Sequence, residues 1–183
     1  MKLFLCFIAA SIARKANIVG TSQSSFGYGN YPASNLLNGK GLKGKFGGDS
    51  CVHTDFGHPQ WISFELEVPE FLYSIKITPR LDPCCLERSR KISVTIGDSK
   101  SYDPKEPLCL KISQLVLQEG LTEYKCTGIP HSGKYVKIAR GVDGSEGIMD
   151  ICEVRIFTVG GNHTLLGGII QSDCLWHSRQ VYK

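Results

Sequence analysis

The chain has 183 residues, of which 42% are hydrophobic and 21% charged, and its formal net charge is +4. This composition is typical of a folded domain and excludes a largely disordered chain. The charge excess is small and scattered along the sequence, which argues against a nucleic-acid-binding protein. With 20 glycines and 8 prolines, the chain is expected to make many turns, as a fold of short strands does.

Residues 1–13 have the order of a secretory signal peptide. A basic start at Lys2 is followed by apolar residues 3–10 and by a small-x-small cleavage site that ends at Ala13. The alternative is a buried N-terminal strand. No run approaches the roughly 20 apolar residues of a membrane-spanning helix. We therefore expect a secreted, extracellular protein that does not insert into membranes.

Seven segments rich in β-branched and aromatic residues are predicted as strands, because Gly, Pro, Asn and Asp separate them. Several alternate with period two, most clearly from Ile62 to Val68. One helical turn is predicted at residues 32–37, with Ser34 or Asn35 as its cap. Seven strands without an intervening helix predict an all-β, antiparallel β-sandwich or jelly roll. The segments are residues 16–22, 61–68, 72–78, 91–96, 123–127, 135–139 and 151–158.

The domain is expected to span residues 14–158, and residues 159–183 are interpreted as an appended tail. The tail holds an N-glycosylation sequon at Asn162 and a cysteine at position 174. Of the eight cysteines, Cys6 lies in the signal segment, so seven remain. An odd number leaves one thiol free or bonded to another chain. Cys174 is one route to a homo-oligomer, and a free thiol is the alternative.

Three basic side chains mark the candidate site: His53, Arg80 and Arg88. The arginines fall at strand ends or in a connecting loop, where binding residues concentrate. Their rigid arrays of donors suit the hydroxyls of a sugar or the oxygens of an acid. Asp82 and Glu87 are close enough in sequence to orient them. The simpler interpretation is a set of surface ion pairs.

Cys84 and Cys85 are adjacent, which is unusual. Neighbouring Cα atoms are ~3.8 Å apart, less than the ~4.4–6.8 Å usual for a disulfide. A bridge between them would be a strained small ring with an apolar sulfur patch, and the alternative is that each pairs elsewhere. The remaining cysteines of the domain form plausible pairs without them: Cys109 with Cys126, and Cys51 with Cys152.

This pattern resembles the fucose-binding motif of the F-type lectins, or fucolectins: His, 26 residues, Arg-x-Asp, four residues, and then Arg or Lys. Here His53 is followed by 26 residues, Arg80-x-Asp82, and Cys84-Cys85-x-Glu87-Arg88. The resemblance covers residues 16–158. It includes the stretches at residues 16–18, 31–39, 50–53, 133–136 and 152–154, together with Trp61.

The resemblance implies a discoidin-like jelly roll that binds terminal L-fucose on fucosylated glycans without catalysis. His53 would bond the axial hydroxyl of the sugar, and Arg80 and Arg88 its ring oxygen and neighbouring hydroxyls. The bridged sulfur pair would pack against the apolar face of fucose, and Phe46 against its methyl group. The disulfides that the resemblance implies are Cys51–Cys152, Cys109–Cys126 and Cys84–Cys85.

The resemblance also implies a structural calcium ion beside the sugar site. Calcium takes about six to eight oxygen ligands, and several here would be backbone carbonyls. Asn38 stands where an Asp is usual, which removes a negative charge and should weaken the ion. The alternative is a loop without metal. The implied ligands are Asn35, Asn38, Lys40, Ser50, Cys152 and Glu153.

Pro83 departs from the family motif, because five residues rather than four separate Asp82 from Arg88. Either the loop bulges at Pro83 and Arg88 still reaches the site, or Arg88 is displaced and Arg90 or nothing replaces it.

Three classes of function remain open. The first is a calcium-stabilised fucose lectin, the second a discoidin-like module that binds protein or membrane after losing sugar binding, and the third an enzyme. Glycoside hydrolysis needs two facing carboxylates, whereas Asp82 and Glu87 lie among arginines, which favour their ionised form. The sequence therefore favours the lectin.

Overall fold

The computed structural model describes residues 13–128, 130–145 and 147–159, and within these ranges the chain folds into one antiparallel sheet of nine strands. Two short 3-10 helices, η1 (Ala33–Leu37) and η2 (Pro83–Ser89), lie in the connecting loops. The strands are β1 (Arg14–Lys15), β2 (Ile18–Gln23), β3 (Val52–His53), β4 (Gln60–Pro79), β5 (Arg90–Gly97), β6 (Leu108–Gln114), β7 (Thr122–Lys125), β8 (Ser132–Arg140) and β9 (Asp150–Val159).

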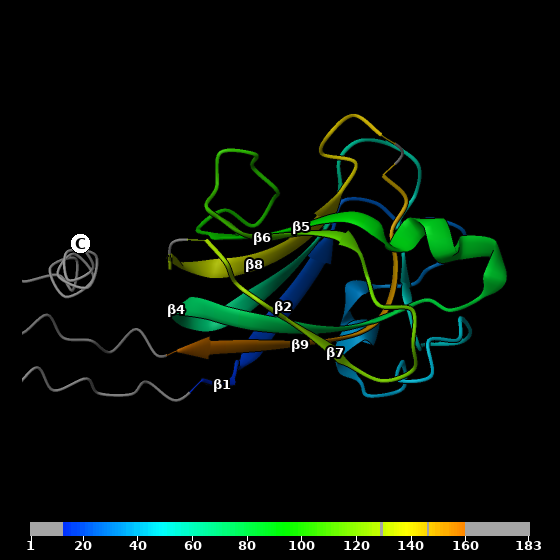
Figure 1. Ribbon diagram of the computed structural model, residues 1–183, viewed down its shortest axis with the longest axis horizontal. Coiled ribbons are helices and arrows are strands. Elements are labelled where there is room, and N and C mark those ends of the chain that lie inside the picture. Colours follow the sequence, from blue (N-terminus) through cyan, green and yellow to red (C-terminus); the bar gives the residue numbers. More distant parts are fainter. Residues whose placement is uncertain (1–12, 129, 146, 160–183) are drawn as a thin grey trace, which may run out of the picture.

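The long strand β4 belongs to both layers of the sandwich (Figure 1). Its first half pairs with β2 and β8, and β5 and β6 extend this layer beyond β8. Its second half pairs with β7 and β9, and β9 pairs in turn with β1 and β3. The register of β4 against β8 shifts between Glu65 and Glu70, where the strand passes from one layer to the other. The sheet thus curls around a single core.

Apolar side chains from both halves of β4 fill the space between the layers. Ile62, Phe64 and Leu66 are buried in the first half, and Ile75 and Ile77 in the second. Successive side chains of a strand point to opposite faces, so every second residue reaches the core. Buried residues of the other strands complete it: Ile92, Val94, Val136, Ile138, Val154 and Ile156.

The predicted all-β antiparallel sandwich is confirmed, with differences in detail. The segments 61–68 and 72–78 form one strand, because Pro69 lies where β4 has no partner in β8 and its missing N–H breaks no pairing there. The predicted turn exists as η1, but its N-cap is Pro32 and no side chain caps it, so the predicted caps are wrong. β6 and η2 have no counterpart among the predicted elements.

Three disulfides link the described residues, in the pairing that the family resemblance implies. They join Cys51 with Cys152, Cys84 with Cys85, and Cys109 with Cys126. The expected signal peptide and tail, with Asn162 and Cys174, fall almost entirely outside the described residues. Within the described ranges, no helix has the length and apolar character needed to cross a membrane.

Candidate functional site

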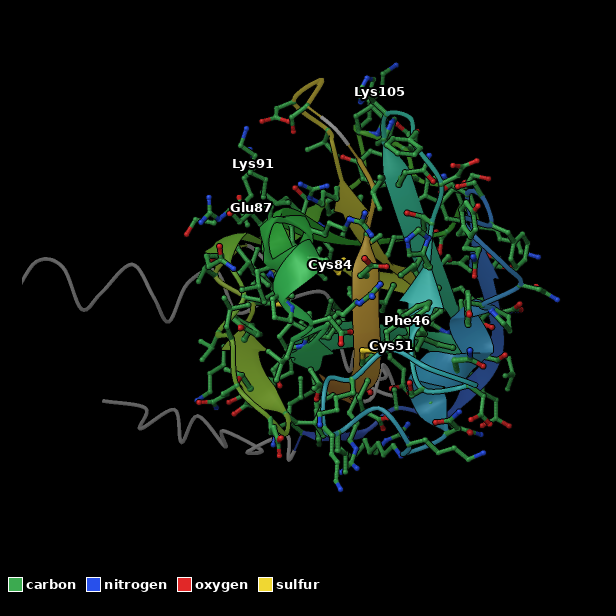
Figure 2. All side chains as sticks on the ribbon, turned by 90° about the vertical axis from the view of Figure 1, so that its right-hand side faces the viewer. Phe46, Cys51, Cys84, Glu87, Lys91 and Lys105 are labelled. Atoms are coloured by element: carbon green, nitrogen blue, oxygen red, sulfur yellow. A yellow bond between two sulfur atoms is a disulfide. The ribbon has the colours of Figure 1, made fainter. Side chains whose placement is uncertain are left out.

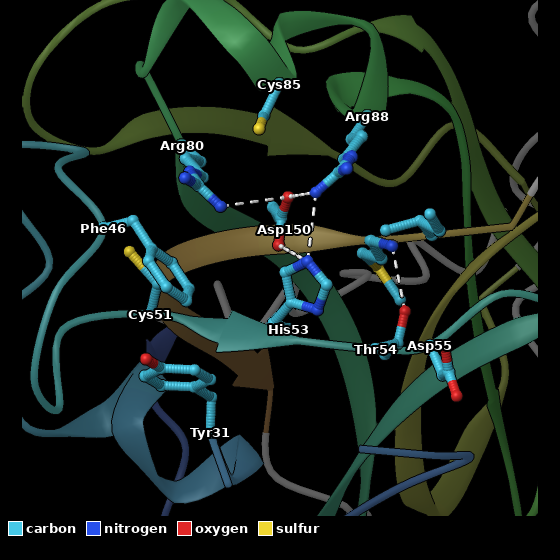
Figure 3. A network of polar contacts seen from close by, with 12 residues as sticks. Tyr31, Phe46, Cys51, His53, Thr54, Asp55, Arg80, Cys85, Arg88 and Asp150 are labelled. Carbon is cyan, nitrogen blue, oxygen red and sulfur yellow. Dashed lines mark hydrogen bonds and ion pairs between the residues drawn. The ribbon is translucent and has the colours of Figure 1, made fainter. Parts of the chain in front are cut away.

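The candidate site lies at one end of the sandwich, where strand ends and loops converge (Figure 2). His53 ends β3, Arg80 directly follows β4, and Arg88 lies in η2. Phe46 comes from the loop between η1 and β3, and Asp150 is the first residue of β9. Side chains from five separate segments therefore meet here, held in place by the rigid sandwich behind them (Figure 3).

All of these side chains except that of Asp150 line a hollow of about 560 Å³. Binding pockets for small ligands are typically roughly 300–1,000 Å³ and combine apolar walls with a few polar groups. The lining has that character, with aromatic rings and a disulfide beside two arginines and a histidine. The residues are Tyr28, Tyr31, Phe46, His53, Asp55, Phe56, Arg80, Cys84, Cys85, Arg88 and Ile148.

Asp150 lies beneath both arginines and has no exposed side-chain surface. Its Oδ2 accepts a hydrogen bond from Arg88 Nη1 at 2.6 Å and lies 3.5 Å from Arg80 Nη1. Its Oδ1 lies 3.5 Å from His53 Nε2. One buried carboxylate thus contacts all three basic side chains that the sequence singled out.

Arg80 is fixed from two sides. Its Nε donates to Asp82 Oδ2 at 2.7 Å, and the same oxygen accepts a hydrogen bond from the backbone N–H of Phe46 at 3.0 Å. The guanidinium also stacks over the Phe46 ring, 4.1 Å from its centroid. Burial alone would raise the pKa of Asp82, but the hydrogen bonds from Arg80 and Phe46 outweigh this and lower it. Asp82 therefore stays ionised and orients Arg80, as the sequence suggests.

Arg88 reaches the site in spite of the extra residue. Pro83 occupies the start of η2, where its fixed φ suits the first turn of a helix. This turn takes up the insertion and brings Arg88 Nη1 to 3.0 Å from His53 Nε2. Arg90 lies outside the site and pairs with Glu87 at 2.7 Å. The expectation that Glu87 orients a site arginine is therefore wrong.

His53 is held in its neutral form. Burial is the largest influence on its pKa and lowers it, Arg88 and Arg80 lower it further, and Asp150 only partly offsets these effects. Because an arginine can only donate, the neutral Nε2 accepts the hydrogen bond from Arg88. Gly27 packs against the other side of the ring, where a Cβ would lie 2.0 Å from His53 Nδ1. Any larger residue at position 27 would displace the imidazole.

The apolar part of the hollow is formed by sulfur and aromatic rings. Cys85 is buried whereas Cys84 is exposed, and Arg80 Nη2 lies 3.6 Å from Cys84 Sγ. The Phe46 ring stands 4.5 Å from the ring of Tyr31 and 5.9 Å from that of His53, centroid to centroid. Phe46 and the paired cysteines thus line the same hollow, as expected.

The residues expected to hold calcium also come together, next to this hollow. The loop at Gly41 runs so close to β9 that a Cβ there would lie 1.7 Å from the carbonyl oxygen of Cys152 and 2.6 Å from that of Ser50. Glu153 is buried, and its Oε2 has no hydrogen-bond partner among the described residues. Burial raises the pKa of Glu153, which a bound cation would oppose.

The amide nitrogens of the two asparagines expected to bind calcium donate hydrogen bonds to backbone carbonyl groups. Asn35 Nδ2 donates to the carbonyl of Cys51 at 3.0 Å, and Asn38 Nδ2 donates to that of Asp49 at 2.6 Å. Lys40 pairs with the carboxylate of Asp49. Asparagine side-chain oxygens and backbone carbonyl oxygens are ligands that calcium prefers. The described residues contain no cluster of three or more His, Cys, Asp or Glu side chains that could hold a metal, so an ion here would rely largely on amide and backbone carbonyl oxygens.

Asp150 and the outer aromatic rim are absent from the predicted site. The signal for Asp150 was available, since it precedes Cys152 by two residues just as His53 follows Cys51 by two. An antiparallel pairing across that disulfide places the two opposite each other. Tyr28 and Phe56, which are 95% and 72% exposed, give no comparable signal because they lie in irregular loops.

Known protein structures share the architecture of this chain, although its sequence alone matches none of the families compared. No protein-family model and no curated protein matches the sequence. The structure is similar to a fucolectin from the serum of the striped bass, Morone saxatilis, with a TM-score of 0.65 and 25% identity over 80% of this chain. The chain spans 50% of the length of that protein.

Two further structures share the fold. One is the lectin domain of lectinolysin in complex with the Lewis b antigen, with a TM-score of 0.60 and 21% identity, over 77% of this chain and 93% of that domain. Another is a fucose-binding module of Streptococcus pneumoniae, with a TM-score of 0.57 and 22% identity, over 76% of this chain and 90% of the module. The protein thus has a discoidin-like sandwich fold. Its resemblance to the F-type lectins, which the sequence motif indicates, is confirmed by these neighbours.

Proposed function

We propose that the protein is a lectin that binds carbohydrate through this hollow and recognises terminal L-fucose. The convergence of Arg80, Arg88 and His53 beside the sulfur and aromatic surface carries the proposal. A sugar presents hydroxyls on its edges and C–H groups on its faces, so it needs donors and an apolar platform together. The similarity to fucose-binding modules supports the choice of sugar.

The charges around the hollow support a binding role without catalysis. Glycosidases use one carboxyl group with a raised pKa as a general acid. Here the pKa of Asp82 is lowered by its hydrogen bonds. Asp150 is covered by Arg80 and Arg88 and has no exposed surface from which to reach a sugar.

The hollow extends beyond the three basic residues, toward an outer rim. This rim contains Tyr28, Asp55 and Phe56, and the buried Ile148 also lines the hollow. The carboxylate of Asp55 accepts only one backbone hydrogen bond, from Phe56, among the described residues and is otherwise exposed. The ligand we propose is therefore a fucosylated glycan, with fucose on the arginines and the next sugar against the rim.

Calcium would act as a structural ion in this lectin. Glu153, Asn35 and Asn38, with the carbonyl groups of Ser50 and Cys152, would hold it and so fix the loop that carries Phe46. The buried, unpartnered Oε2 of Glu153 supports the assignment. The disulfides and the apparent signal segment support secretion, where calcium is plentiful and thiols are oxidised.

Screening the purified protein on a glycan array, with and without a chelator, tests the proposal. We expect binding to glycans that end in L-fucose and not to the same glycans without fucose, and weaker binding in chelator. Arg80→Ala is the matched control, because it should lose the signal. Binding to anionic vesicles in place of fucosylated glycans would instead favour a membrane-binding discoidin-like module and overturn the proposal.

A further inference from the structure

Asp150 gives the hollow a property that two arginines alone would not have. Closely spaced guanidinium groups are typical of sites that bind sulfate, phosphate or carboxylate, because each offers several N–H donors in a fixed plane. Arg80 and Arg88 approach the same oxygen of Asp150, at 3.5 and 2.6 Å from their Nη1 atoms. Without that oxygen, only Asp82 would balance the two guanidinium groups, and Arg88 would have no carboxylate within 4 Å among the described residues, so that it could attract an anion.

The positive charges of Arg80 and Arg88 are balanced with Asp150 in place. Arg80 has Asp82 at 2.7 Å on one side and Asp150 on the other, and Arg88 has Asp150. His53 adds no charge near neutral pH, since burial lowers its pKa. The two arginines thus face two carboxylates, each within 4 Å of a guanidinium group, and their N–H groups meet the ligand without excess positive charge.

The position of Asp150 follows from the backbone. Asp150 pairs with His53 in the register of β9 against β3, and the neighbouring pair is Val52 with Ile151. The Cys51–Cys152 disulfide joins the same two segments one step further on. The backbone at Asp150 is therefore held by two strands and a disulfide, and the hydrogen bond from Arg88 holds the buried carboxylate beneath the hollow.

We propose that Asp150 is the specificity-determining residue of this site: by neutralising Arg80 and Arg88 from below, it makes the hollow select neutral hydroxyl groups over anionic ligands. It acts through the arginines and has no exposed surface to touch a ligand itself. This inference rests on the proposed function for the identity of the neutral ligand. The effect of Asp150 on anions does not depend on that identity.

The test compares wild type, Asp150→Asn and Asp143→Asn by calorimetric titration with L-fucose and, separately, with inorganic sulfate. Asparagine keeps the shape of Asp150 but replaces a negatively charged acceptor by a neutral amide. Asp143→Asn is the matched control, because Asp143 pairs with Lys91 at the surface and does not line the hollow. Circular dichroism and thermal melts verify that each variant is folded.

We expect wild type and Asp143→Asn to bind fucose and to give no heat with millimolar sulfate. Asp150→Asn should lose at least about tenfold in fucose affinity and gain sulfate binding. A purely structural role would lower fucose affinity without creating an anion site. The inference would be overturned if a folded Asp150→Asn variant did not bind sulfate, or if wild type bound sulfate as tightly as the variant does.

The experiment also distinguishes two further outcomes, a variant that does not fold and a wild type that does not bind fucose. If Asp150→Asn does not fold, the fucose affinity of wild type is compared in sulfate and in chloride at equal ionic strength. Equal affinities support charge balance, and competition by sulfate overturns it. If wild type fails to bind fucose while Asp150→Asn gains sulfate binding, the proposed sugar is wrong but the role of Asp150 stands.

Discussion

His53 and Asp150 face each other across the antiparallel pairing of β3 with β9, with His53 Nε2 3.5 Å from Asp150 Oδ1. The Cys51–Cys152 disulfide flanks this pair and holds the two segments together. The imidazole lines the hollow, the carboxylate lies buried beneath it, and both contact the guanidinium of Arg88. The sheet register thus sets the spacing between His53, which would meet a sugar, and the carboxylate that supports it.

The buried position of His53 makes stability depend on pH. Its pKa is lowered in the folded state, mainly by burial, from an ordinary value of 6.5. As pH falls below 6.5, the unfolded state binds a proton that the folded state still excludes, so the free energy of unfolding decreases. The decrease should end once pH falls below the folded-state pKa. Arg88, Arg80, Asp150 and Asp55 all affect this titration.

Urea unfolding at a series of pH values checks this expectation. His53→Gln should flatten the dependence between neutral and weakly acid pH, because the glutamine does not titrate. His131→Gln serves as the control, since His131 is exposed and lies outside the described contacts of the hollow. An equal effect of the two substitutions would show that His53 does not cause the dependence.

Arg80→Ala should weaken fucose binding while leaving the sandwich intact. Arg80 lies just beyond β4 and only 13% of its side chain is exposed, so its donors act in a nearly dry site. A hydrogen bond to a charged donor contributes about 1.5–3 kcal/mol, or roughly ten- to a hundredfold in affinity. Titration with free fucose measures the loss. Arg90→Ala, outside the hollow and paired with Glu87, should leave the affinity unchanged.

Calcium should raise the melting temperature by a modest amount. An ion that binds only the folded state, at about five times its Kd, adds about 1 kcal/mol, which is roughly 2–4 °C for a chain of this size. Asn38→Asp should enlarge the rise, because it restores a negative charge, and Glu153→Gln should abolish it. If melts in chelator and in millimolar calcium coincide for wild type, the calcium proposal fails.

Mild reductant should lower fucose affinity before it lowers the melting temperature. Cys84 is exposed, whereas Cys51, Cys152 and Cys109 are buried, so a thiol reaches the Cys84–Cys85 bridge first. Opening that bridge removes the sulfur surface of the hollow but no link between strands. Parallel titrations and melts in increasing reductant measure the order of the two losses. Peptide mapping that links Cys84 or Cys85 to a distant cysteine would contradict the prediction.

Much of the architecture could be predicted because the core strands alternate with period two, as in Ile62 to Val68. The sequence does not predict β6 as a strand, because Leu108–Gln114 contains Leu, Lys and Gln, which are not enriched in strands. η2 escapes because a short 3-10 turn has no periodic pattern. What Pro83 does could be decided only by the three-dimensional path of that turn, which returns Arg88 to the site.

The candidate site shows the same division between local and non-local information. His53, Arg80 and Arg88 stand out through a motif within one stretch of sequence. Asp150 is separated from Arg88 by 62 positions, and only the pairing of β3 with β9 brings it near. The roles of the motif residues toward fucose stay predictions until binding is measured.

The last prediction concerns Lys137, which lies on β8 with no exposed side-chain surface. Its ammonium group donates to the carboxylate of Glu106 and to the carbonyl of Ser99, both in the loop between β5 and β6. Removing one member of a buried ion pair leaves the other uncompensated, which costs about 3–5 kcal/mol. Lys137→Met should therefore lower the free energy of unfolding by that amount.

Replacing both partners should cost much less, since Lys137→Met with Glu106→Met leaves no buried charge. Lys134→Met is the control on the same strand. Lys134 pairs with Glu65 at the surface, with 41% and 30% of the two side chains exposed, and solvent screening leaves such pairs with little effect on stability. Urea unfolding of the four proteins measures these differences. If Lys137→Met costs no more than Lys134→Met, the buried pair does not anchor the loop.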